Sequence, residues 1–164
     1  DKFSTGFTLY YMHMGLAEAS VNSFVADVGI LYRVGIQGMK IGMAIQSLGG
    51  EVTFDDRSAR MPTMFKVGVS FEPIRTARQK LMASGEFQHP ADNAERANFG
   101  LEYSMDNTFF LRGGYNVNYD AETFSAGAGF AIRTSEKSAV TLDYSYVDMS
   151  SLGGVHRVSV AFGY

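Results

Sequence analysis

The sequence contains no cysteine, only 3 prolines, and no apolar run long enough to cross a membrane as a helix. Without cysteine the chain can form neither disulfide bonds nor a thiolate metal site. A transmembrane helix needs about 20 consecutive apolar residues, and no such segment occurs. This absence does not exclude a membrane protein built from strands, because a strand shows its lipid-facing side chains only at every second residue.

The chain also lacks a basic excess. Its 164 residues carry 14 Lys and Arg against 17 Asp and Glu, a formal net charge of −3. Nucleic-acid binding depends on clustered positive charge that neutralises phosphates, so we expect no nucleic-acid partner. A chain of this length normally forms one domain, and we expect a single domain over residues 1–164.

Apolar and polar residues alternate along most of the chain. Aromatic residues make up 13% of it and there are 18 glycines, a composition that suits strands and turns better than helices. Phe99, Leu101 and Tyr103, for example, fall on one face of a strand, and the residues between them fall on the other. Regular alternation covers residues 39–46, 65–72, 96–105, 109–118, 124–133 and 140–146, and less regular alternation covers residues 3–13, 23–33, 80–88 and 155–164.

These stretches predict about ten strands of roughly 9–11 residues, the length that crosses a bilayer at a tilt. Strands of soluble proteins are shorter, commonly about 5–6 residues. The predicted links alternate between short and mostly longer ones, as in outer-membrane barrels with short periplasmic turns and longer external loops. Short links are expected near Val34–Gly38, Arg75–Gln79, Asp106–Asn107 and Thr134–Lys137, and the others over Gly15–Asn22, Leu48–Pro62, His89–Glu95, Asp120–Glu122 and Asp148–Gly154.

Alternation alone does not say which face of the strands is outside. The apolar face points inward in a soluble lipocalin-like barrel and toward lipid in a membrane barrel. Strand length, a polar face rich in small residues, and aromatic residues toward the strand ends favour the membrane barrel, in which aromatic girdles mark the two interfaces. The aromatic residues in question are Phe3, Tyr11, Tyr32, Phe71, Phe87, Tyr103, Phe109, Tyr146 and Tyr164.

We therefore predict an all-β fold, a transmembrane antiparallel up-and-down β-barrel that crosses the cell outer membrane many times and is surrounded by its lipid. The charges on the polar face are then expected to point into the lumen, where they shape passage or plug contacts or pair across neighbouring strands. These residues are Asp27, Arg33, Lys40, Lys66, Glu72, Glu86, Arg96, Glu102, Arg112, Arg133, Asp143 and Arg157.

The end of the chain has the form of an assembly signal. Val158, Val160, Phe162 and the final Tyr164 occupy alternate positions. This pattern resembles the C-terminal β-signal that outer-membrane assembly machinery recognises on new barrels. The alternative is the ordinary last strand of a soluble barrel.

Several segments also follow the pattern of a known family. Residues 24–33 read Phe-Val-Ala-Asp-Val-Gly-Ile-Leu-Tyr-Arg, residues 45–50 read Ile-Gln-Ser-Leu-Gly-Gly, and Met61-Pro62 precedes the next strand. The chain resembles the PorV/PorQ family of outer-membrane proteins, in which aspartate-x-glycine-x-x-tyrosine and glutamine-asparagine-leucine-glycine segments occur in this order. Ser47 stands where asparagine is common, and Val155–Ser159 also looks like family members.

The resemblance implies a barrel related to the FadL fatty-acid transporters, with about fourteen strands. The chain shows fewer, so we expect it to be the C-terminal portion of such a barrel that lacks N-terminal strands; a closed ten-strand barrel is the alternative. The implied role is non-enzymatic, in type IX protein secretion, with translocon, cargo or other envelope proteins as partners. The alternatives are FadL-like transport of hydrophobic small molecules through an apolar lumen pocket, and a scaffold barrel within a larger envelope complex.

No motif predicts catalysis, a metal site or a cofactor. His13, His89 and His156 lack the spacing of zinc ligands. Asp55-Asp56 with Asp92 and Glu95 lack the spacing of a calcium loop, and a rim site of His13 with Glu18 is too sparse for a hydrolase. Gly49-Gly50 and Gly113-Gly114 are expected at turns or bulges and not in a phosphate-binding loop.

Overall fold

The chain folds into one long antiparallel sheet of ten strands in the order of the sequence. The computed structural model describes residues 2–16, 19–49, 51–54, 57–133 and 138–163. The strands of the sheet are β1 (Phe3–Leu16), β2 (Ala19–Arg33), β3 (Lys40–Leu48), β6 (Met64–Arg75), β7 (Gln79–Pro90), β8 (Arg96–Met105), β9 (Phe109–Val117), β10 (Phe124–Arg133), β11 (Ala139–Asp148) and β12 (Gly154–Gly163). The all-β, up-and-down prediction is confirmed.

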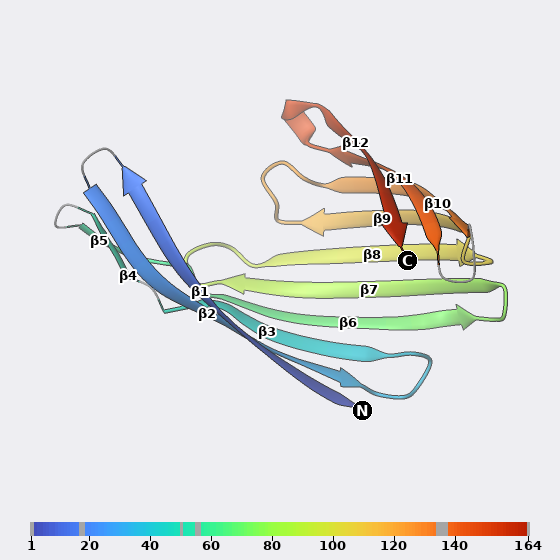
Figure 1. Ribbon diagram of the computed structural model, residues 1–164, viewed down its shortest axis with the longest axis horizontal. Helices are drawn as coiled ribbons and strands as arrows, with labels where there is room; N and C mark the ends of the chain where they lie inside the picture. The colour runs from blue at the N-terminus through green and yellow to red at the C-terminus, as the bar shows by residue number, and fades with distance from the viewer. Residues whose placement is uncertain (1, 17–18, 50, 55–56, 134–137, 164) are drawn as a thin grey trace.

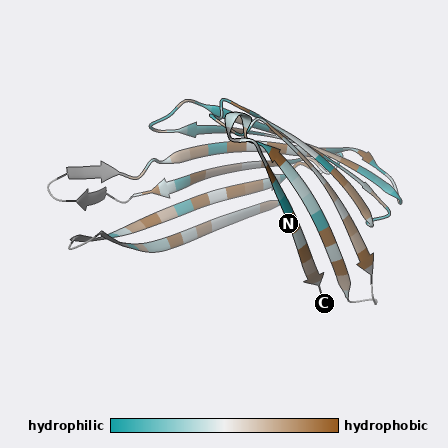
Figure 2. Cartoon of the chain, turned by 90° about the horizontal axis from the view of Figure 1, so that it is seen from above, coloured by the Kyte–Doolittle hydropathy of each residue, from teal (hydrophilic) through white to brown (hydrophobic). Residues whose placement is uncertain are grey.

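The sheet is open. Strands β1 and β12 form its two edges, and no pairing joins them in the described part of the chain. Figures 1 and 2 show a strongly twisted and curved sheet with these two strands on opposite edges. The described residues therefore do not form the closed ten-strand barrel that was the alternative to part of a larger barrel.

Two of the predicted long loops contain strands. Residues 15–22 were expected to form a loop, but β1 and β2 pair as far as Leu16 and Ala19. Within the predicted loop 48–62, β4 (Glu51–Phe54) and β5 (Arg57–Arg60) form a separate two-stranded sheet. Figure 1 shows the two hairpins projecting side by side from the end of the sheet where the mostly longer links lie.

The short links lie at the opposite end of the sheet and use residues that tolerate a positive φ. Gly35 and Gly38 have φ values of +82° and +63°, and Asp106 and Asn107 both have a φ of +52°. Asn and Asp enter this region more readily than other non-glycine residues, so the pair can reverse the chain within two residues. The predicted Asp106–Asn107 turn is confirmed.

Helical structure is limited to one short turn in the described residues. The segment η1 (Ser150–Leu152) is a 3-10 helix between β11 and β12. No helix among the described residues has the length and apolar character that a membrane crossing would require.

The register divides the side chains into two rows. Phe99 of β8 lies opposite Tyr115 of β9, and Glu102 lies opposite Arg112 on the other face. The strands in Figure 2 accordingly alternate between hydrophilic and hydrophobic colours along their length. Two irregularities interrupt the pairing, between Ala26 and Val28 and between Phe71 and Ile74.

Candidate functional site: the polar face of the sheet

All twelve predicted lumen charges occupy positions on one face of the sheet. Residues directly opposite each other on paired strands share a face, as do alternate residues along one strand. Arg33 lies opposite Lys40, for example, and Asp143 lies opposite Gly129 and Ser159. Arg133 shares this face by its backbone position, opposite Ala139. We call this shared face the polar face.

The polar face surrounds a large hollow. A cavity of about 850 Å³ is lined mainly by polar-face residues of β1, β2, β3 and β6 to β10. Glycine and serine predominate in this lining, and the charged members are Lys40, Lys66 and Glu86. Small side chains leave room above the strands, so the hollow is wide and its floor is largely backbone.

Burial is reversed relative to a soluble sheet protein. The buried polar residues are Ser23, Glu72, Gln88 and Ser104, all on the polar face, and Ser104 is only 4% exposed. Large apolar side chains on the opposite face are exposed over the whole sheet, up to 76% for Phe162. Soluble monomers rarely expose a continuous apolar surface of more than a few hundred Å², and exposed apolar patches of larger extent commonly mark interaction surfaces.

The polar face of β8 to β11 carries a three-residue ion network. Arg112 donates from Nε to Glu102 Oε2 at 2.8 Å and from Nη1 to Asp143 Oδ1 at 2.6 Å. The guanidinium carbon also lies 5.3 Å from the ring centre of Phe110. One cation therefore neutralises part of the charge of two carboxylates and links strands that are not all neighbours.

Glycines on β10 make room for this network. Arg112 lies opposite Gly127, and Asp143 lies opposite Gly129. A Cβ atom on Gly129 would overlap the Asp143 carboxylate and would lie 3.3 Å from Arg112 Nη1. The missing side chains let Arg112 reach across β10 to β11.

A second ion cluster lies near the short links. Glu72 is 8% exposed and accepts a hydrogen bond from Arg75 Nη1 at 2.8 Å, while Lys80 Nζ lies 3.4 Å away. The turn before β3 covers it, since a Cβ on Gly38 would lie 2.8 Å from the Glu72 carboxyl group. A carboxylate buried this far needs such partners, because an unpaired buried charge is costly.

A third cluster occupies the other end of β7 and β8. Glu86 Oε1 accepts hydrogen bonds from Gln88 Nε2 at 2.5 Å and from Asn98 Nδ2 at 3.4 Å. Tyr119 Oη lies 3.5 Å from Gln88 Oε1, and Arg96 packs over the Tyr119 ring at 4.9 Å. Glu86 and Arg96 therefore each have a defined partner.

Asp27 supports the irregular pairing between β2 and β3. Its Oδ1 accepts the backbone N–H of Ser47 at 2.9 Å, and its Oδ2 accepts from Tyr10 Oη at 3.2 Å. Ser47 has a φ of +59°, a conformation that side-chain hydrogen bonding can stabilise. The aspartate of the family-like segment thus has a structural role here.

Three cations of the polar face have no partner among the described residues. Within the described residues, Lys40, Lys66 and Arg157 have no ion pair and no hydrogen bond from their side chains. Arg33, by contrast, donates to Ser4 Oγ at 3.0 Å. Lys66 is partly buried, whereas Lys40 and Arg157 are exposed.

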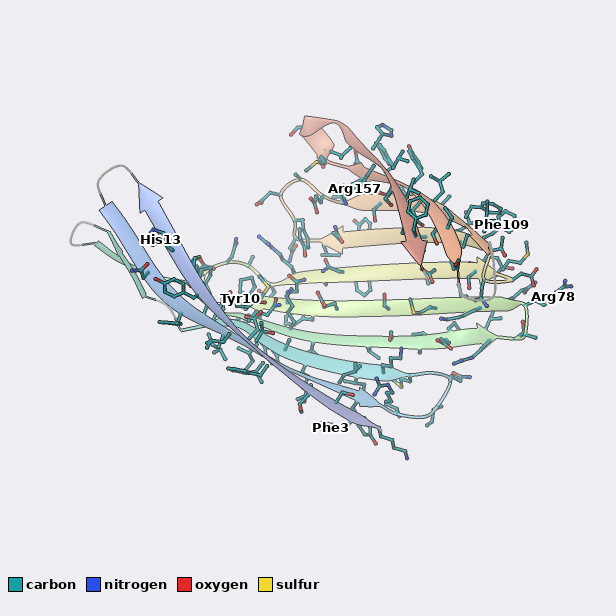
Figure 3. All side chains as sticks on the ribbon, in the orientation of Figure 1. Phe3, Tyr10, His13, Arg78, Phe109 and Arg157 are labelled. Carbon is teal, nitrogen blue, oxygen red and sulfur yellow. The ribbon has the colours of Figure 1, made fainter. Side chains whose placement is uncertain are left out.

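The opposite, apolar face carries paired aromatic rings near both ends of the sheet. Tyr11 and Phe24 lie 5.2 Å apart toward the β1–β2 hairpin, and Phe109 and Phe130 lie 4.9 Å apart beside the short links. Figure 3 shows Phe3 and Phe109 at this second end, and Tyr10 and His13 along the hairpin. Aromatic ring pairs therefore occur on the apolar face near both ends of the strands.

A smaller apolar hollow lies on the apolar face. Its volume is about 680 Å³, and Phe71, Phe99, Leu101, Tyr115 and Phe124 are among its lining residues. Gly85 and Gly113 on the same face create the depression. The apolar hollow thus opens on the apolar face. FadL-like transport would instead need an apolar pocket on the polar face.

The histidines are separated, as the sequence predicted. His13 Nδ1 lies 2.7 Å from Asn22 Oδ1, His89 Nδ1 lies 3.4 Å from Glu95, and His156 Nδ1 lies 2.7 Å from Tyr144 Oη. The described residues contain no group of three side chains that could hold a metal ion. Asp55, Asp56 and Glu18, weighed as site residues, lie outside the described part of the chain.

The proposed assembly signal lies on the edge strand β12. Val158, Val160 and Phe162 project from the apolar face with exposed side chains. Tyr164 lies outside the described residues. The alternate spacing therefore holds at the three positions that the structure describes.

Sequence reasoning missed the residues that organise these clusters. Gln88, Asn98, Tyr119 and Tyr10 are uncharged and were not selected, although Gln88 and Asn98 fall in the polar row. Gly127 and Gly129 also fall in that row, and two glycines beside charged neighbours were a usable indication of room for long side chains.

Comparison with known proteins gives no further guide. No protein-family model matches the chain. No curated protein matches it at a significant level. Functional inference therefore depends on the two faces of the sheet and on the residues described above.

Proposed function

We propose that this chain forms the wall of an outer-membrane β-barrel, with its apolar face toward lipid and its polar face toward a water-filled lumen. The observation that carries this proposal is the reversed burial, in which polar side chains line the hollow and large apolar side chains are exposed on the other face. The strand lengths of 9–15 residues in the sheet agree with a bilayer crossing.

Within this barrel, the polar lumen favours passage or holding of hydrophilic chains, as in PorV-type protein secretion. The ion networks and the glycine and serine floor are suited to polar cargo, because they offer hydrogen-bonding groups and few apolar contacts. FadL-like transport of hydrophobic molecules has less support, since the apolar hollow lies on the other face. Secretion itself is inferred from the family-like segments, and envelope proteins would be the partners.

The absence of cysteine provides a direct test of the two faces. Val69→Cys and Ser70→Cys place a single thiol on neighbouring residues of β6 that belong to opposite rows. Each thiol is labelled with an environment-sensitive fluorophore in the membrane-inserted protein. We expect spin-labelled lipids to quench the label at position 69 and aqueous iodide to quench the label at position 70.

The matched control is Leu101→Cys, which repeats the apolar row on β8 and should behave like position 69. Equal iodide quenching at positions 69 and 70, with no lipid quenching at either, would refute the membrane-wall proposal. The secretion role is tested separately, by crosslinking from position 70 in cells. Crosslinks to exported proteins or translocon components support that role, and their absence opposes it.

A further inference from the structure

The structure assigns an anion-binding site to the polar face between Lys40 of β3 and Lys66 of β6, for a carboxylate or phosphate group. This inference goes beyond a passive polar wall, because it gives one part of the hollow a ligand of defined charge. It depends on side chains of the polar face and can be tested in solubilised protein.

The two lysines flank a pair of glycines on neighbouring strands, and the Leu31 side chain borders one of them, Gly42. Gly42 lies opposite Gly68, while Lys40 lies two residues before Gly42 and Lys66 lies two residues before Gly68. Because the strands are antiparallel, the two lysines stand at opposite ends of the glycine pair. All four residues line the 850 Å³ hollow.

Hydroxyl groups complete the surroundings. Ser70 lies opposite both Lys40 and Ser84, so a lysine and two serines form one cross-strand row beside the glycine pair. Both serines line the hollow, but the Ser84 hydroxyl donates to the Gly100 carbonyl oxygen at 3.4 Å, so within the described residues Ser70 is the serine of this row whose hydroxyl has no hydrogen-bond partner. Serine hydroxyls donate hydrogen bonds to anionic oxygens, and such charge-assisted bonds are stronger than neutral ones.

The lysines are available to a ligand, unlike most other cations of this face. Within the described residues neither ammonium group has an ion pair or a hydrogen bond. Lys66 is partly buried. Burial removes part of the hydration of its charge, and the attraction of a bound anion would offset that loss. Lysine is a common point-charge ligand for phosphate.

The nearest acid does not fill this site. Glu86 lies opposite Gly68, and its Cβ and Cγ would lie 3.8 Å from a Cβ atom on that glycine. Its carboxylate accepts hydrogen bonds from Gln88 of β7 and Asn98 of β8. No ion pair joins it to either lysine within the described residues. The space over Gly42 and Gly68 is therefore bordered by two positive charges and one carboxylate that is held by other partners.

The test uses calorimetric titration of the protein in an uncharged detergent at low salt, with inorganic phosphate, acetate, octanoate and the neutral analogue octanol as probes. We expect at least one anion to bind, and Lys40→Gln and Lys66→Gln each to weaken it by about tenfold or more, since each removes a charge-assisted contact. Lys66→Arg should retain binding.

Arg157→Gln is the matched control. It removes the same charge from another unpaired cation of the polar face, but on β12 and outside the residues that line the hollow. Figure 3 shows Arg157 on this distant edge strand. Binding should be unchanged in this variant.

The probes distinguish the source of the anionic group. Phosphate binding without octanoate binding indicates a phosphate ligand, whereas octanoate binding tighter than acetate binding indicates an amphiphilic acid. Failure of every anion to bind would overturn the inference, as would equal weakening by Arg157→Gln. The quenching experiment on positions 69 and 70 is independent, so the site and the membrane wall can fail separately.

Discussion

Strands β8 to β11 and strands β3 and β6 present cations on the same face, but their surroundings differ. Arg112 is held between two carboxylates on β8 and β11. Lys40 lies opposite Arg33 and Ser70, and neither it nor Lys66 has an ionic partner in the described part of the chain. The first region uses its charge to join strands, whereas the second leaves its charge available to solvent or a ligand.

This difference follows from the residues placed opposite each cation. Arg112 has Glu102 directly across the strand pair and a glycine on its other side that opens the way to Asp143. Lys66 has Ala44 on one side and Gln88 on the other. Neighbouring side chains thus decide whether a charge on this wall stabilises the sheet or remains free to bind.

The largest effect is expected from Arg112→Met. This variant leaves the Glu102 and Asp143 carboxylates without their shared cation, although partial exposure of all three side chains lets solvent reduce the cost. We expect the free energy of unfolding to fall by about 2 kcal/mol. Urea unfolding of the protein in lipid vesicles measures this change. Because the chain contains no tryptophan, unfolding is followed by an attached fluorescent label or by gel mobility.

The matched control for Arg112→Met is the triple variant that also carries Glu102→Gln and Asp143→Asn. It removes the orphaned negative charges and should recover most of the loss. No recovery would mean that packing over Phe110, and not the ion network, accounts for the contribution of Arg112.

A smaller effect is expected from Gly129→Ala. The added Cβ would overlap the Asp143 carboxylate, which must move and lengthen its contact with Arg112. We expect a loss of about 1 kcal/mol in the same unfolding measurement. Gly113→Ala on β9 is the control, because nothing lies within 4 Å of the added atom; a similar loss there would contradict the assigned role of Gly129.

The smallest effect is expected from Lys66→Met, which removes a cation that has no partner. The free energy of unfolding should change by no more than about 0.5 kcal/mol, and an increase is consistent with relief of an unpaired charge. A loss as large as that of Arg112→Met would remove the distinction between the two regions.

Much of the sheet could be predicted from the sequence because strand side chains have a period of two residues. Parity alone placed Glu102, Arg112 and Asp143 on one face, and the Asp106–Asn107 turn agreed with its residue types. The β1–β2 hairpin was underestimated because Gly15 and Asn22 indicated a loop, while pairing between the strands extends past both positions.

The contacts within the polar face could not be predicted in the same way. Pairing of Arg112 with Asp143 depends on the register of three strands and on the absence of side chains at Gly127 and Gly129. Likewise, Asp27 meets Ser47 only because the β2–β3 pairing is irregular at that point. Register and local irregularity are properties of paired strands and cannot be obtained from one strand's alternation.

The direction of the two edge strands limits which further strands could join this sheet into a closed ring. Ten strands in strict antiparallel order leave β1 and β12 running in opposite directions. Each further antiparallel neighbour reverses the direction once, so a ring that keeps this order can accept only an even number of extra strands, with zero corresponding to direct pairing of β1 with β12. An odd number would bring two strands of the same direction together and require the slanted hydrogen bonds of a parallel pair.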